Sequence, residues 1–180
     1  IKHKRMNGNN SFWNQAARSG LVLGGVSSLY LALTHLIGLI NLSGLTAILI
    51  FILNAILWIA KFAGCIYLMM LFISRYRQSQ PEDISKSRPS AFSYGALVSF
   101  LSALIYSAVQ LAYTTYIVPD YYETISEVYK MAIDQTALEQ IISKMPIIMF
   151  FSNLIYCTLF GIIVTAFANK RSASSNPFKN

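Results

Sequence analysis

The chain has 180 residues, of which 55% are hydrophobic and only 12% are charged, and its formal net charge is +7. So few charged side chains cannot cover the surface of a water-soluble globule of this size, and the composition therefore favours an integral membrane protein. The basic residues are scattered around the ends of apolar segments, a pattern that argues against a nucleic-acid partner.

An uncharged run of 42 residues between Arg18 and Lys61 predicts the first two membrane spans. As a single helix this run would be roughly 63 Å long, about twice the roughly 30 Å hydrocarbon core of a bilayer. The polar turn at 41–44 therefore joins two spans, expected at 18–40 and 45–74. Two later apolar stretches predict further spans at 90–118 and 146–169. The expected fold is an all-α polytopic membrane protein with four transmembrane helices.

The distribution of Lys and Arg predicts the orientation of these spans, because short cytoplasmic loops keep basic residues. Eleven basic residues lie in the arm at 1–17 with Arg18, in the link between spans two and three, and in the tail from Lys170 onward, against two in the loop between spans three and four. The arm, the link and the tail at 171–180 are therefore expected in the cytoplasm. The four spans form one transmembrane domain at 18–170.

The outer loop at 119–145 is expected to be helical. An apolar face recurs from Asp120 to Asp134, and the capping box Thr136-Ala137-Leu138-Glu139 predicts the start of a second short helix. Pro146 suits the first turn of the last span. Within the spans, small residues recur at helical spacing from Gly20 and Gly24, from Gly95 and at Gly161, which predicts the faces where the helices meet.

Lys61 is the one formal charge well inside a span, and it shares a stripe with Asn54, Trp58 and Cys65. No acidic residue occurs at its depth in any span, so an internal salt bridge is not expected. The first interpretation is structural: Lys61 is neutral, or it snorkels toward carbonyls, water or the indole of Trp58. The second is a binding site for an anion, either a lipid phosphate or an acidic group on a partner subunit. The candidate residues of this site are Lys61, Trp58, Asn54, Arg75 and Arg77. Proton or ion translocation is a third reading.

Polar residues also form an expected layer nearer the outer face: His35, Asn54, Gln110 and Asn153, one on each span. They would either hydrogen-bond between helices or line a wet substrate path. His35 has no second ligand at metal-binding spacing, so no metal site is expected. No nucleophile and base, phosphate loop or carboxylate pair can be assembled within the membrane. We therefore expect no enzymatic activity and no cofactor.

Several short motifs resemble a bacterial family of four-span inner-membrane proteins, the domain of unknown function number 4199. They are the approach Phe12-Trp13-Asn14 to Gly20 and Gly24, the internal Lys61 leading to Arg75-Tyr76-Arg77, Phe92-Ser93-Tyr94-Gly95, and Pro119-Asp120-Tyr121-Tyr122. The resemblance covers most of the chain and implies a bacterial inner-membrane location. The family has no established activity or catalytic residues, but its resemblance implies a partner, a membrane-associated glycosyltransferase of the polyprenyl-phosphate type.

Two functions of different classes remain as expectations. The first is a non-enzymatic accessory or scaffold subunit that partners such a glycosyltransferase and binds membrane lipids, with a lipid phosphate near Lys61. Self-association into a homo-oligomer is left open beside it. The second is a small transporter or lipid flippase, which would require inverted repeats, broken helices or a wet path; the sequence shows no internal repeat and no proline within the first three spans.

Overall fold

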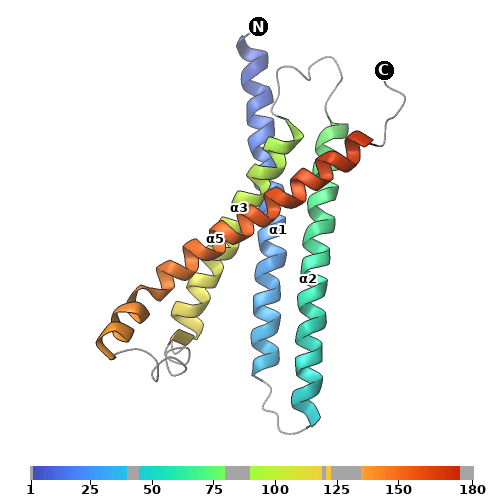
Figure 1. Cartoon of the computed structure of the whole chain (residues 1–180). Coiled ribbons are helices and arrows are strands. Elements are labelled where there is room, and N and C mark those ends of the chain that lie inside the picture. Colours follow the sequence, from blue (N-terminus) through green and yellow to red (C-terminus); the bar gives the residue numbers. More distant parts are fainter. Residues whose placement is uncertain (1, 40–44, 80–89, 119–120, 123–134, 175–180) are drawn as a thin grey trace.

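The structure is a computed structural model that describes residues 2–39, 45–79, 90–118, 121–122 and 135–174. The described elements are the helices α1 (Lys2–Gly38), α2 (Leu45–Gln78), α3 (Ala91–Ala112) and α5 (Gln135–Ser174) and the π-helical turn η2 (Tyr113–Ile117), and they include no strand. Figure 1 shows them as a bundle of long helices.

Four stretches of these helices are long and apolar enough to cross a membrane: Phe12–Gly38, Ile48–Gln78, Ala91–Ile117 and Glu139–Lys170. The predicted all-α, four-span fold is confirmed. Because successive helices alternate in direction, α2 ends at the same end of the bundle as α5 (Figure 1). We call this the basic end, defined by Arg75, Arg77 and Lys170, and we call the opposite end the far end.

Helix α3 lies at the centre of the bundle. It packs most extensively against α5 and α1, whereas α2 touches its neighbours less (Figure 1). The α1–α3 contact depends on Gly20 and Gly24, where a Cβ atom would lie 2.8 Å from Leu101 Cβ and 2.9 Å from Ile105 Cβ. In lipid, where no hydrophobic force drives helices together, such close backbone approach supplies the van der Waals contact that holds them.

The α3–α5 contact uses two reciprocal pairs of small residues. A Cβ atom on Gly95 would collide with the Thr165 side chain, and one on Gly161 would collide with Ser99. Ser99 Oγ donates to Gly95 O at 2.7 Å and Thr165 Oγ1 donates to Gly161 O at 2.8 Å, so both hydroxyls are satisfied within their own helices. The predicted small-residue faces thus lie at the two tightest helix contacts.

The basic end has its own aromatic core, and it alters one predicted boundary. Tyr76 and Tyr94 stack at a centroid distance of 4.1 Å, Phe12 meets both rings edge-on, and Tyr94 is hydrogen-bonded to Ser19 at 2.8 Å. The arm predicted at 1–17 therefore does not stay separate from the transmembrane domain. Helix α1 starts at Lys2, and Phe12 and Ala16 are buried because apolar side chains one turn apart extend its inward face.

The far end differs from the prediction at the start of the last span. Helix α5 runs without interruption from Gln135 to Ser174 and contains Pro146, so the proline is not in the first turn and residues 135–145 are no separate loop helix. Proline inside a membrane helix is tolerated when neighbouring groups satisfy the freed carbonyl. The predicted helix over 120–134 falls almost entirely outside the described residues; Tyr122, which is described, is buried and hydrogen-bonded to Thr114 at 2.9 Å.

A candidate ligand cavity at Lys61

Lys61 lies near the middle of α2, about 20 Å from Ile48 and about 26 Å from Gln78 at 1.5 Å per residue. Its side chain is half-buried and points into the bundle. The ammonium Nζ lies over two aromatic rings, 4.7 Å from the centroid of Tyr30 on α1 and 4.5 Å from that of Tyr106 on α3. The negative faces of both rings attract the cation, so Lys61 is held between α1 and α3.

These two tyrosines, and not Trp58, provide the rings under the ammonium. Trp58 instead packs on Phe62 at a centroid distance of 4.6 Å, and Phe62 meets Phe160 of α5 edge-on at 5.3 Å. Trp58 was the predicted aromatic partner of Lys61 because it lies three residues away on the same helix. The aromatic rings that contact the ammonium instead belong to neighbouring helices. Tyr106 could have been found from the sequence, because it belongs to the small-residue face of the third span at about the depth of Lys61.

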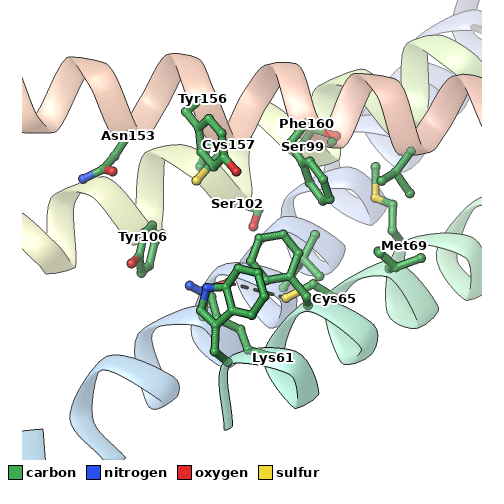
Figure 2. A pocket seen from close by; sticks show the side chains of 18 residues that line it. Lys61, Cys65, Met69, Ser99, Ser102, Tyr106, Asn153, Tyr156, Cys157 and Phe160 are labelled. Carbon is green, nitrogen blue, oxygen red and sulfur yellow. Dashed lines mark hydrogen bonds between the residues drawn. The ribbon is translucent and has the colours of Figure 1, made fainter. Parts of the chain in front are cut away.

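A cavity of about 240 Å³ adjoins Lys61, with walls contributed by all four long helices. Figure 2 shows Lys61 below it, Ser102 and Tyr106 of α3 beside it, and Cys157 and Phe160 of α5 above it. Leu23, Ile66 and Val164 make much of the remaining lining apolar. Of the described residues that line the cavity, Lys61 alone carries a formal charge. Among all the described residues the only acidic one is Glu139, which is exposed near the start of α5.

The cavity opens sideways between α2 and α5. Trp58 on α2 is 52% exposed and Tyr156 on α5 is 61% exposed, and both contribute to the lining. At the basic end the two helices are joined by Arg77, which donates to the side-chain and backbone oxygens of Asn169. From that junction α2 and α5 diverge toward the far end (Figure 1). The exposed part of the cavity lining therefore lies on these two helices.

The predicted polar layer is divided into separate contacts. Asn153 Nδ2 donates to Gln110 Oε1 at 2.8 Å, joining α5 to α3, and His35 Nδ1 is hydrogen-bonded to the Tyr113 hydroxyl at 2.8 Å, joining α1 to η2. The Oδ1 atom of Asn54 is buried without a hydrogen-bond partner. Of the four residues only Asn153 lines the cavity. The layer is therefore mainly a set of interhelical hydrogen bonds.

Arg75 and Arg77 do not join Lys61 in one site. They lie about 21 Å and about 24 Å farther along α2 at 1.5 Å per residue, at the basic end. Arg75 is exposed, and Arg77 is engaged with Asn169. A helix cannot bend these positions together, so the predicted set of five residues splits into a mid-membrane group and a surface group. The part of the chain that the structure describes holds no cluster of three or more His, Cys, Asp or Glu residues.

Comparison with protein families gives one match. The model of the family described as "Protein of unknown function (DUF4199)" matches residues 18–170. The chain belongs to the DUF4199 family. No curated protein and no solved structure matches it.

The DUF4199 region contains every residue that lines the cavity, together with Tyr30 and both pairs of reciprocal small residues. Phe12 lies before the start of the match. The site around Lys61 therefore belongs wholly to the part of the chain that defines membership of DUF4199.

Proposed function

We propose that this protein is a non-enzymatic integral membrane subunit that holds the acidic group of a lipid at Lys61. The observation that carries this proposal is a lysine in a partly open cavity whose described lining residues include no acidic side chain. A charge at this depth costs about 2.5–3.5 kcal/mol on translocon scales. The cation–π interaction with each ring offsets about 0.5–2 kcal/mol of this cost. An anionic ligand would in addition supply a full counter-charge.

The shape of the cavity supports a lipid as the ligand. The exposed residues of its lining are aromatic, Trp58 on α2 and Tyr156 on α5. A hydrocarbon chain could pack there while its acidic group reaches Lys61. A water-soluble anion would have to cross the apolar region alone, at a much higher cost of desolvation.

The proposal includes a partner and a location. A polyprenyl-phosphate-type glycosyltransferase, which the family resemblance implies, would join a sugar to a polyprenyl phosphate, and both its lipid substrate and its phosphodiester product carry an acidic group that could reach Lys61. Such a pair would sit in the bacterial inner membrane, with both termini of this chain in the cytoplasm. Arg75, exposed at the basic end, is available to anionic head groups or to the partner.

A second candidate, a lipid flippase, is favoured by one observation, the mid-depth position of Lys61. Transporters place their substrate sites near the bilayer midplane. The two candidates separate in liposomes that contain the purified protein. A flippase would accelerate exchange of a labelled acidic lipid between leaflets, whereas the accessory subunit would bind the lipid without moving it.

The Lys61→Met variant tests the proposed function. Methionine keeps an unbranched apolar stem and removes only the charge. We expect the variant to insert and fold but to retain about tenfold less acidic lipid, a loss of about 1.4 kcal/mol in affinity. The measurement is mass spectrometry of lipids that co-purify in mild detergent. Lys144→Met, which removes an exposed lysine near the far end, is the matched control. Equal acidic lipid in Lys61→Met and the parent would contradict the proposal.

The proposed orientation is tested by cysteine labelling in intact cells. We expect a cysteine introduced by Ser85→Cys in the basic link to resist a membrane-impermeant thiol reagent, because eleven basic residues hold that side in the cytoplasm. Ser126→Cys, in the loop between the last two spans, should react readily and is the control. Strong labelling at position 85, with protection at 126, would reverse the topology.

A further inference from the structure

We infer that the cavity at Lys61 selects a lipid whose acidic group carries a single negative charge. Phosphodiesters and carboxylates meet this condition, and phosphomonoesters do not. The inference rests on the proposed function and narrows its ligand class. It starts from the charge of the cavity lining, which is one ammonium group.

The two rings limit how an acidic group can approach this ammonium. Nζ lies 4.7 Å from the ring centroid of Tyr30 and 4.5 Å from that of Tyr106. These rings occupy the sides of the ammonium that face α1 and α3. A lysine ammonium has three N–H donors. The remaining side faces the cavity, where Cys157 of α5 and Cys65 of α2 belong to the lining. The ammonium can therefore bind one pair of acidic oxygens there, and the described residues that line the cavity include no second cation.

Charge balance in a medium of low dielectric then separates the ligand classes. A carboxylate or phosphodiester paired with Lys61 leaves the buried pair neutral. A phosphomonoester, whose second pKa is about 6, carries between about 1.5 and 2 negative charges at neutral pH. Its excess charge would be buried without a partner, and an unpaired buried charge is strongly unfavourable. The hydroxyls of Ser102 and Tyr106 are neutral and cannot compensate it.

The rest of the cavity fits one hydrocarbon chain. Leu23 and Val164 provide apolar walls, and Phe62 and Phe160 meet edge-on in the same lining. The opening lies at Trp58 and Tyr156. A chain that enters there would bring its acidic group to Lys61 and leave its remaining length between α2 and α5.

Trp58 provides a reporter at this opening. The chain has two tryptophans, so Trp13→Phe leaves Trp58 as the single tryptophan. The probe is dibromostearate, a single-chain carboxylate whose bromine atoms quench nearby tryptophan, added to this protein in neutral detergent micelles. Its uncharged methyl ester controls for partition into the micelle. We expect dibromostearate to quench Trp58 at about tenfold lower concentration than the methyl ester, a factor that corresponds to about 1.4 kcal/mol. Adding Lys61→Met should remove the difference.

The charge class is then tested with two competitors that share one chain, hexadecyl phosphate and its monomethyl ester. At pH 8 the first carries two charges and the second carries one. At pH 8 we expect hexadecyl methyl phosphate to relieve the quenching at about tenfold lower concentration than hexadecyl phosphate. At pH 5 hexadecyl phosphate is also singly charged, so the two compounds should compete equally.

Two failures are distinguishable. If hexadecyl phosphate competes at pH 8 as well as its methyl ester does, the single-charge selection is wrong and acidic-lipid binding at Lys61 stands. If dibromostearate quenches no better than its methyl ester in the parent, both the selection and the proposed function are wrong.

Discussion

Replacing Gly24 by leucine should separate α1 from α3, whereas the same replacement at the neighbouring Gly25 should leave the fold intact. A Cβ atom at Gly24 would lie 2.9 Å from Ile105 Cβ and 3.1 Å from the backbone oxygen of Ser102, which cannot move away. A Cβ atom at Gly25 would meet nothing within 4 Å. Overpacking of this kind costs about 3 kcal/mol.

Melting in mild detergent measures this pair of variants. At about 2–4 °C per kcal/mol for a chain of this size, Gly24→Leu should lower the melting temperature by about 10 °C. Gly25→Leu should leave it unchanged or raise it slightly, because leucine favours helix more than glycine does. Similar melting temperatures for both variants would show that α1 and α3 do not meet at Gly24.

The second large effect is expected at the α3–α5 contact, from exchanging two residues across it. Gly95→Thr alone places a branched side chain against Thr165 and should cost about 3 kcal/mol, again by overpacking. Adding Thr165→Gly removes the same side-chain volume from the opposite helix. The double variant should therefore recover most of the lost stability, which is the sign of two residues in direct contact.

The measurement is a double-mutant cycle from the melting of four proteins: the parent, each single variant and the double variant. Gly64→Thr is the control, since a Cβ atom at Gly64 would meet nothing within 4 Å. If the effects of the two single variants simply add, the contact between residues 95 and 165 does not exist.

The architecture was predictable because a membrane restricts the choices so strongly. The lengths of the uncharged segments predicted the number of spans. Small residues at helical spacing predicted the helix contacts at Gly20, Gly24, Gly95 and Gly161. The boundaries were less predictable. Phe12 and Ala16 lie in a mostly polar segment, so their place in the first membrane helix was not evident from composition. Pro146 favours a helix start because proline is common in the first turn, yet it lies inside α5.

The site was predictable in part, since a charge in a span is visible without a structure. Tyr106 was a candidate neighbour from its face and depth, but which rings reach the charge was not predictable, because helix rotation and crossing decide it. Tyr30 and Tyr106 come from two other helices, and no spacing within α2 indicates them. For the same reason His35 and Gln110, which were predicted to belong to one polar layer, bond to different partners.

The position of α2 in the chain has a consequence for biosynthesis. α2 follows α1 and precedes α3, yet one of the two rings that face Lys61, Tyr106, belongs to α3. During synthesis Lys61 must therefore enter the bilayer with only Tyr30 available, and Tyr106 joins it after α3 has been inserted. The interval between these two events is when a newly made chain most needs help from the insertion machinery, and translation that stalled between α2 and α3 would leave that intermediate exposed in the membrane.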